Sequence, residues 1–370
     1  MFELDEPYVD EKEIKYLTEA ISSGWISSQG PFVKKLEKMF ADYIGVKYAV
    51  SCFSGTSALM LLHQTLQLEK EDEIITQSLT FSAVGFAMKQ SGVKIVFADC
   101  SENKFTLSPE DVKRKITNKT KIIIPTHLYG RPAEMDELKK ICDKNNIYLV
   151  EDCCQAVGAI YKNKKVGSIG HFNIFSFHNK GVASGEGGMI TTNDKHLAER
   201  FDNLKNPCSV NRPEERNGFS EISMNHRMSN LHAAVAVAQL ERLEKNIKIK
   251  IKIANLYDEK FKNAQGIKII KRDSFNRTIY WRYTIILDDK INVKNFINEA
   301  KKLNIVTRET YLPLHLHPLF KKSDQISLPN CEKISKLGVD IPSGIKLSEK
   351  DIEYISKNLK EIVKKHLNLN

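Results

Sequence analysis

The feature that most limits the fold of this chain is the alternation of short apolar segments with helical segments in its N-terminal half. Apolar side chains recur at helical spacing over residues 31–44, and a second helical pattern covers residues 57–66. Short apolar runs typical of buried strands occur at residues 48–51, 73–76, 94–98, 121–125, 148–151, 173–177 and 188–192. Strands separated by helices predict an α/β fold, in which helices cover both faces of a mostly parallel sheet.

The pattern changes after a long helix that is expected to end near residue 245. An Ile- and Lys-rich helix is predicted next, followed by two strands and two helices, at residues 246–262, 267–271, 280–287, 293–303 and 348–365. This order is typical of a smaller α+β domain. We therefore predict a large domain over residues 1–245 and a small C-terminal domain over residues 246–370.

Composition narrows the class of protein. A length of 370 residues, with 41% hydrophobic and 28% charged residues, is that of an ordinary globular protein with a large core. No apolar run approaches the roughly 20 residues that a membrane-spanning helix needs. The net charge of +10 favours anionic partners, but the lysines are spread along the chain, so we expect a phosphorylated small substrate and no nucleic acid. The acidic N-terminus predicts a cytoplasmic protein.

The seven cysteines form no CxxC pair, and their number is odd. They are Cys52, Cys100, Cys142, Cys153, Cys154, Cys208 and Cys331. We expect reduced thiols without a disulfide framework. His315 and His317 could share one face of a strand, but no carboxylate or cysteine lies close to them in the sequence, so no metal site is predicted.

Lys180 is the strongest candidate for a reactive side chain. It ends the segment Ser176-Phe177-His178-Asn179-Lys180, which follows an apolar strand and precedes the glycine-rich run 185–188. A lysine on a short loop among hydroxyl groups and glycines suits a Schiff-base lysine, whose amine binds an aldehyde cofactor and then moves protons.

Two further segments follow the ends of predicted strands, where ligands of open parallel sheets gather. Ser54-Gly55-Thr56 precedes a helix and would suit a phosphate, although a simple helix cap explains it as well. Asp152 ends an apolar strand, where a carboxylate is costly to bury without a cation. A protonated pyridine nitrogen would be such a cation, and a helix cap is again the alternative. Gln155 could then hydrogen-bond a ring substituent.

Asn225 and Arg227 precede a long amphipathic helix, and no helix cap explains them. Phe81 is a candidate for stacking on a ring. One lysine, one aspartate, one stacking ring and several phosphate-binding groups together form the set that an enzyme dependent on pyridoxal phosphate needs.

At this point the chain resembles a known family, the sugar aminotransferases of the DegT/DnrJ/EryC1/StrS group within fold type I of the pyridoxal phosphate enzymes. The similarity extends over nearly the whole chain. It rests on the order of the stretches 23–28, 45–50, 54–56, 127–132, 151–152, 185–188, 225–228, 238–243, 315–318 and 342–344.

The resemblance implies a role for individual residues. Lys180 is the Schiff-base lysine, and Asp152 pairs with the pyridinium nitrogen. Gln155 lies near the ring oxygen, and Phe81 stacks on the ring. The expected phosphate ligands are Gly55, Thr56, Ser176 and, from the other subunit of an obligatory homodimer, Asn225. The expected sugar-nucleotide pocket contains Trp25, Ser27, His178, Arg308 and His315.

The implied reaction is amino transfer from glutamate to a nucleotide-linked keto-sugar for polysaccharide or glycan biosynthesis. Trp25-Ile26-Ser27-Ser28 with Asn179-Lys180 is similar to perosamine synthases, which implies GDP-4-keto-6-deoxymannose as the acceptor.

The chain differs from the family in one spacing, since relatives usually have one more residue between Ser176 and Lys180. Two alternatives stay open: a sugar dehydratase, in which histidine replaces the lysine, and a regulator of the same fold without catalysis.

Overall fold

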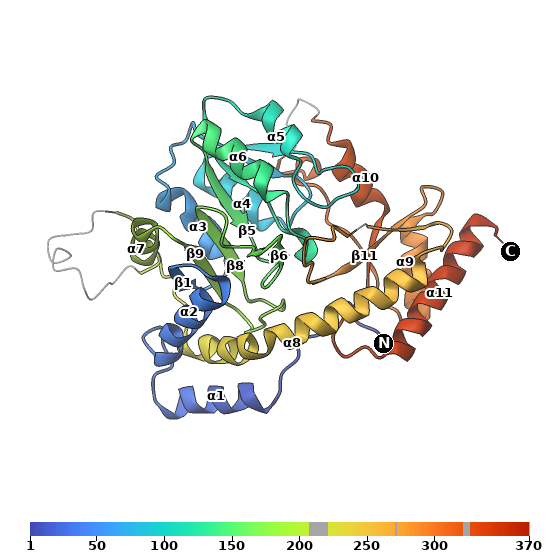
Figure 1. Cartoon of the computed structure of the whole chain (residues 1–370), viewed down its shortest axis with the longest axis horizontal. Coiled ribbons are helices and arrows are strands. Elements are labelled where there is room, and N and C mark those ends of the chain that lie inside the picture. Colours follow the sequence, from blue (N-terminus) through green and yellow to red (C-terminus); the bar gives the residue numbers. More distant parts are fainter. Residues whose placement is uncertain (207–220, 271, 321–325, 370) are drawn as a thin grey trace.

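A computed structural model describes residues 1–206, 221–270, 272–320 and 326–369 (Figure 1). Its centre is a seven-stranded sheet in the order β1-β9-β8-β5-β4-β2-β3. The strands are β1 (Tyr48–Cys52), β2 (Glu73–Gln77), β3 (Lys94–Ala98), β4 (Thr120–Ile124), β5 (Tyr148–Asp152), β8 (Phe172–Ser176) and β9 (Gly188–Thr192). Only β9 runs against its neighbours in this sheet. The predicted α/β class and the seven predicted strands are therefore confirmed.

Helices pack on both faces of this sheet. One face is covered by α2 (Pro31–Ile44), α5 (Pro109–Lys115), α6 (Met135–Asn145) and the first half of α8 (Asn230–Phe261). The other face is covered by α3 (Gly55–Thr65), α4 (Ala83–Ser91) and α7 (Lys195–Leu204). Ile74 and Ile75 are neighbours in β2 and are both fully buried, one in each of the two cores. Burial on both faces explains why the strands appear in the sequence as continuous apolar runs.

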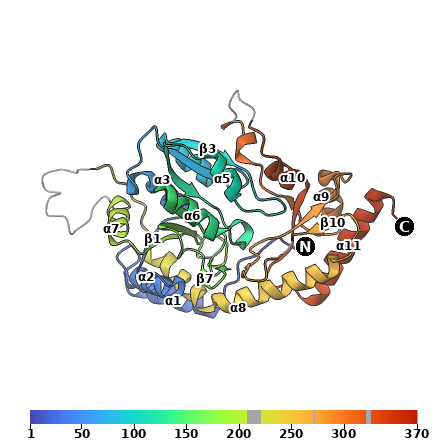
Figure 2. The same ribbon diagram turned by 45° about the horizontal axis from the view of Figure 1, so that its top comes forward.

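The helix α8 (Asn230–Phe261) corrects one prediction, because the two helices expected on either side of residue 245 form a single helix of 32 residues. Figures 1 and 2 show α8 extending from α1 (Glu11–Ser22) and α2 at one end to α11 (Glu349–Leu367) at the other. Val237, in its first half, packs in the core of the large sheet, whereas Tyr257 packs in the core of the C-terminal part. The predicted domain boundary at residue 246 stays a prediction, and α8 crosses it without a break.

A smaller antiparallel sheet, in the order β10-β11-β13-β12, packs against the C-terminal helices. Its strands are β10 (Ile267–Ile269), β11 (Tyr283–Leu287), β12 (Arg308–Glu309) and β13 (Gly338–Ile341), and the remaining helices are α1 (Glu11–Ser22), α9 (Val293–Lys302), α10 (Pro329–Leu337) and α11 (Glu349–Leu367). A short hairpin of β6 (Ile160–Tyr161) and β7 (Lys164–Lys165), and single 3₁₀ turns at Leu128–Gly130 and Leu314–Leu316, complete the described elements.

The strand β11 begins three residues later than the sequence predicts. Tyr280 has a positive φ of 51°, which an extended strand does not allow. Trp281 and Arg282 therefore precede the strand and are not members of it. Both residues line the main cavity of the molecule instead.

The carboxyl ends of β4 and β5 are joined by two side-chain pairs. On one side of the sheet, His127 Nε2 lies 2.9 Å from Glu151 Oε2, and both side chains are fully buried. On the other, Thr126 Oγ1 donates to Asp152 Oδ2 at 3.2 Å. Glu151 also accepts backbone N–H groups from the loop at Gly167, Ile169 and Gly170, at 3.0, 2.8 and 2.7 Å.

None of the described helices is long and apolar enough to cross a membrane. The six cysteines within the described ranges are free thiols. The seventh, Cys208, lies outside the described residues.

The Glu151 network generates a prediction about stability. Burial alone raises the pKa of Glu151, but the hydrogen bonds from His127 and from the backbone outweigh burial and leave the pKa below its ordinary value. In Glu151→Gln, an amide N–H₂ group has to face backbone N–H donors. We expect the variant to lose about 3–5 kcal/mol of unfolding free energy at pH 7, measured by urea denaturation.

The contribution of Glu151 to the free energy of unfolding should decrease as the pH falls. Because the folded pKa is lowered, the contribution of Glu151 is complete above the ordinary carboxyl value of about 4.3 and is lost as the pH falls through the folded value. The difference between wild type and Glu151→Gln should therefore shrink below about pH 4. Glu137→Gln, at an exposed position of α6, is the control and should change stability by less than about 0.5 kcal/mol. Equal stability of the two variants would contradict the prediction.

Candidate active site

A cavity of about 450 Å³ lies at the carboxyl ends of the large sheet. One wall comes from the ends of β1, β5 and β8 and from the segments that follow them, and the other comes from the residues around β11 and β12. Predicted site residues that line the cavity are Gly55, Thr56, Phe81, Asp152, Gln155, Ser176, His178, Lys180 and Arg308. Segments far apart in the sequence therefore meet here, as expected for strands that end at one edge of a sheet.

The first turn of α3 forms one end of the cavity. Ser54 caps this helix, because its Oγ accepts the backbone N–H of Ser57 at 3.0 Å. A Cβ atom at Gly55 would lie 2.8 Å from Cys154 Sγ and 3.0 Å from the Cβ of Ser176. Only glycine permits this close approach of three segments. The helix N-terminus, with its positive end of the dipole, faces the cavity beside the hydroxyl groups of Thr56 and Ser176.

Asp152 lies in the wall of the cavity with only 4% of its surface exposed. Its Oδ1 accepts the backbone N–H of Cys154 at 3.0 Å, and its Oδ2 accepts the hydroxyl of Thr126. Within the described residues, no Lys, Arg or His forms an ion pair with it. A buried carboxylate that lacks a cation and faces an open cavity is a site for a cationic group of a ligand.

Gln155, Tyr311 and Phe81 form a connected group. Gln155 Oε1 accepts the backbone N–H of Tyr129 at 2.9 Å, and its Nε2 donates to the hydroxyl of Tyr311 at 3.3 Å. One N–H of the amide is left for a ligand. Phe81 contacts Tyr311 edge to face, with ring centroids 6.0 Å apart, and leaves 49% of its surface exposed. A flat ring could stack on its open face.

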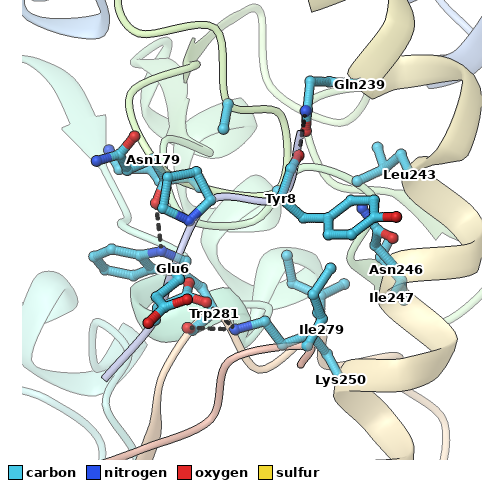
Figure 3. Close-up of a pocket in the computed structure, with 16 residues that line it drawn as sticks. Glu6, Tyr8, Asn179, Gln239, Leu243, Asn246, Ile247, Lys250, Ile279 and Trp281 are labelled. Carbon is cyan, nitrogen blue, oxygen red and sulfur yellow. Dashed lines mark hydrogen bonds and ion pairs between the residues drawn. The ribbon is translucent and has the colours of Figure 1, made fainter. Parts of the chain in front are cut away.

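Lys180 lies between the main cavity and a second cavity of about 50 Å³, shown in Figure 3. The preceding residue, Asn179, has a φ of +39°, and its carbonyl accepts the indole N–H of Trp281 at 3.2 Å. The ammonium group of Lys180 is 5.7 Å from the centre of the Trp281 ring. Figure 3 shows Trp281 beside Asn179, with the N-terminal residues Glu6 to Tyr8 crossing the smaller cavity. Trp281 thus fixes the loop that presents the lysine.

The His178 ring is turned toward the glycine-rich loop. Its Nδ1 lies 3.0 Å from the carbonyl oxygen of Gly185 and 3.3 Å from Glu186 Oε1. His178 still lines the cavity, as does Glu186.

Cys154 also lines the cavity, but it is no candidate for a nucleophile. Burial raises the pKa of this thiol well above its ordinary value, and the charge of Asp152 adds to the effect, although Lys180 acts in the opposite direction. The thiol therefore stays protonated near neutral pH.

Four predicted site residues do not line the cavity of the single chain. Trp25 and Ser27 are exposed, and their backbone carbonyls accept hydrogen bonds from Asn230 at the start of α8. Asn225 is exposed, and its Oδ1 accepts from Arg227 Nε at 2.9 Å. His315 is buried instead, with its Nδ1 2.7 Å from Ser78 Oγ and its Nε2 3.1 Å from Glu332 Oε1. Its ring serves the packing between α10 and the large sheet.

Residues of the cavity wall that sequence reasoning did not single out include Trp281, Arg282 and Tyr311. The first two were assigned to a strand, where their side chains would alternate between the faces of the small sheet. One signal could have identified this segment. Arg282 is an arginine inside an otherwise apolar stretch, and a buried charge requires a partner.

A cluster of His127, Glu151 and Cys153 could in principle hold a metal ion. Both nitrogens of His127 are engaged, however, because Nδ1 accepts the backbone N–H of Ala133 at 2.9 Å and Nε2 then donates to Glu151. Glu151 is saturated by backbone donors. The cluster is explained by its structural hydrogen bonds.

Comparison with known proteins agrees with the family that the sequence motifs indicate. Residues 7–360 match the DegT/DnrJ/EryC1/StrS aminotransferase family. The chain is 34% identical to the GDP-perosamine synthase of Vibrio cholerae, over 97% of this chain and 98% of that protein. It is 29% identical to the UDP-4-amino-4,6-dideoxy-N-acetyl-beta-L-altrosamine transaminase of Campylobacter jejuni, over 96% of each chain.

The fold agrees with a solved structure of Helicobacter pylori PseC, an aminotransferase involved in the biosynthesis of pseudoaminic acid. The TM-score is 0.94, with 24% identity, and the match covers 98% of this chain and 99% of the other. The family predicted from the sequence motifs is therefore confirmed, and the chain belongs to the DegT/DnrJ/EryC1/StrS aminotransferase family.

Proposed function

We propose that this aminotransferase moves the amino group of glutamate to the keto group of a nucleotide-linked sugar, with GDP-4-keto-6-deoxymannose as the acceptor. The cofactor of the family is pyridoxal phosphate. The observation that carries the proposal is the cavity in which Lys180, the buried Asp152 and the N-terminus of α3 meet. The choice of sugar is supported by the 34% identity with an enzyme named GDP-perosamine synthase.

The residues of the cavity fit pyridoxal phosphate by their chemistry. Asp152 is a buried carboxylate in need of a cation, which a protonated pyridine nitrogen would provide. Gly55 keeps the α3 N-terminus close to Ser176, and a Cβ atom would fill this cradle. Helix N–H groups with the hydroxyls of Thr56 and Ser176 would hold the phosphate. Phe81 would stack on the ring, and the free N–H of Gln155 would reach its oxygen.

Lys180 would hold the cofactor covalently through Nζ and then carry the reacting proton. When bound, the cofactor supplies an aldehyde that takes up the amino group and a protonated ring that withdraws electrons from the reacting carbon. Lys180 Nζ removes a proton from glutamate as a base and returns a proton to the sugar carbon as an acid. Asp152 would keep the ring nitrogen of the cofactor protonated. Trp281 keeps the lysine loop in place through Asn179.

The dehydratase alternative requires histidine at the position of Lys180. The nearest histidine, His178, has its Nδ1 turned to the carbonyl of Gly185 and does not replace the lysine. We therefore favour transamination.

The proposal also includes a homodimer with shared active sites and a cytoplasmic location. Asn225, which is exposed outside the cavity, would reach the phosphate bound in the other subunit of a homodimer. A reducing, cytoplasmic location would agree with the six free cysteines of the described chain. Trp25 and Ser27, also exposed, would meet the nucleotide-sugar in that dimer, and Arg308 lines the cavity where this substrate would bind.

The direct test of the proposed function is a substrate panel. The holoenzyme is incubated with glutamate and with GDP-, UDP- or dTDP-linked 4-keto-6-deoxy sugars, and the products are identified by mass spectrometry. We expect an amino sugar and 2-oxoglutarate in equal amounts, with the GDP-linked sugar as the best acceptor. Release of ammonia with a deoxy sugar would establish the dehydratase alternative instead.

Lys180→Ala should abolish turnover and covalent retention of the cofactor, because no other described lysine lines the main cavity. The measurement is borohydride reduction followed by mass spectrometry of the intact protein, which should find the cofactor attached to wild type only. Lys140→Ala, at an exposed position of α6, is the matched control and should behave as wild type. Normal turnover of Lys180→Ala would contradict the assignment. Failure of wild type to retain cofactor would favour a regulator.

The shared active site can be tested by complementation. If Asn225 acts in the opposite subunit, a heterodimer of Lys180→Ala and Asn225→Ala contains one site with both lesions and one intact site. We expect the Lys180→Ala homodimer to be inactive. The Asn225→Ala homodimer should be weak at limiting cofactor, since loss of a hydrogen bond to a charged phosphate costs roughly 1.5–3 kcal/mol.

The heterodimer, purified with two different affinity tags, should regain up to half of the wild-type activity. No gain over the two homodimers would show that Asn225 acts within its own subunit or not at all.

A further inference from the structure

Arg282 is a charged side chain in the cavity wall that is only partly satisfied. It lies between Trp281 and Tyr283, both buried, immediately before β11. Its guanidinium carbon is 4.8 Å from the centre of the Trp281 ring. Two of its donor atoms, Nε and Nη1, are buried and have no hydrogen-bond acceptor in the described part of the chain.

Two buried donor atoms of an arginine that lack acceptors lower the stability of a protein that binds no ligand. An arginine side chain stays protonated, so it cannot escape the cost by losing its charge. Each buried donor that loses water without gaining a partner destabilises the fold, and the loss is larger for a charged group. Because Arg282 also lines a cavity of about 450 Å³, an anion bound in that cavity would supply the missing acceptors.

The carboxylates near Arg282 are already engaged. Asp340 is fully buried and accepts from Thr284 Oγ1 at 2.7 Å and from Arg308 Nη2 at 3.2 Å. Burial raises the pKa of Asp340, and the charges of Arg308 and Arg282 act in the opposite direction. Asp5, another acid in the cavity wall, is paired with Lys250 at 2.9 Å.

This wall therefore has an excess of positive charge. Arg308 pairs with the buried carboxylate of Asp340, whereas Arg282 forms no ion pair within the described residues, and Arg308 has its own buried Nε without an acceptor. The planar fork of an arginine matches the two oxygens of a carboxylate or a phosphate. The α3 N-terminus and Ser176 are already the proposed ligands of the cofactor phosphate, so we assign a second anion to the arginines of this wall.

We propose that Arg282, supported by Arg308, binds an oxyanion of a substrate in the main cavity. That oxyanion is a carboxylate of the amino donor or a phosphate of the nucleotide sugar. The inference rests on the proposed function and adds to it the residue that recognises the charged part of one substrate.

The test separates the two half-reactions. Arg282→Met keeps much of the side-chain length without the charge, and Arg282→Lys keeps the charge without the fork. Reconstituted holoenzymes are mixed with glutamate, and their amine forms are mixed with GDP-4-keto-6-deoxymannose, while the cofactor absorbance is followed by stopped flow. Calorimetry with glutarate and with GDP-mannose measures binding without reaction.

Arg282→Met should raise the half-saturating concentration of one substrate, and weaken binding of its unreactive mimic, by about 10- to 100-fold. Arg282→Lys should fall between wild type and Arg282→Met, because a point charge replaces a two-pronged contact. An effect on glutamate and glutarate identifies the donor carboxylate, and an effect on the two GDP-sugars identifies the phosphate. Arg114→Met, at an exposed position of α5, is the control and should change neither substrate.

Several results would overturn the inference. Unchanged saturation by both substrates in Arg282→Met would show that no substrate anion binds there. Weaker cofactor retention with unchanged substrates would assign Arg282 to the cofactor, and dissociation of the oligomer with unchanged substrates would assign it to a subunit contact. A wild type that catalyses neither half-reaction would overturn the proposed function and this inference with it, whereas an active wild type with a normal Arg282→Met overturns the inference alone.

Discussion

The pairing of the ends of β4 and β5 is the constraint on which the site depends. Two consecutive residues after β4, Thr126 and His127, pair with two consecutive residues at the end of β5, Asp152 and Glu151. Successive side chains of a strand point to opposite faces. The His127–Glu151 pair therefore lies in the protein interior, and the Thr126–Asp152 pair lies on the side of the cavity. The buried Glu151 network fixes the strand end, and Asp152 takes its position from that strand end.

A second constraint comes from outside the large sheet. Trp281 belongs to the segment that leads into the small sheet, yet its indole N–H holds the carbonyl beside Lys180. The positive φ of Tyr280 delays the start of β11 and leaves Trp281 and Arg282 free to face the cavity. Lys180 is therefore positioned jointly by the loop that contains it and by a segment about 100 residues later.

Much of the fold could be predicted because the sequence patterns are local. A strand buried on both faces, such as Ile74 and Ile75 with their neighbours, appears as a continuous apolar run, and Ser54 before α3 is a helix cap. The position of polar residues at strand ends was predictable for the same reason. The burial of His315 was not, because its partners Ser78 and Glu332 come from distant segments, and the sequence cannot indicate that they will enclose it.

The sequence by itself determined the α/β class, the seven strands of the large sheet, the family and the residues at the sheet edge that suit pyridoxal phosphate. Each of these depends on residue type and on short spacings, which the chain contains before it folds. Only the tertiary structure decided that α8 is one helix, that Trp281 supports the lysine loop and that Arg282 faces the cavity with open donors. These features depend on contacts between distant segments and on where a strand begins, and burial and unfilled hydrogen bonds exist only once those segments are packed together.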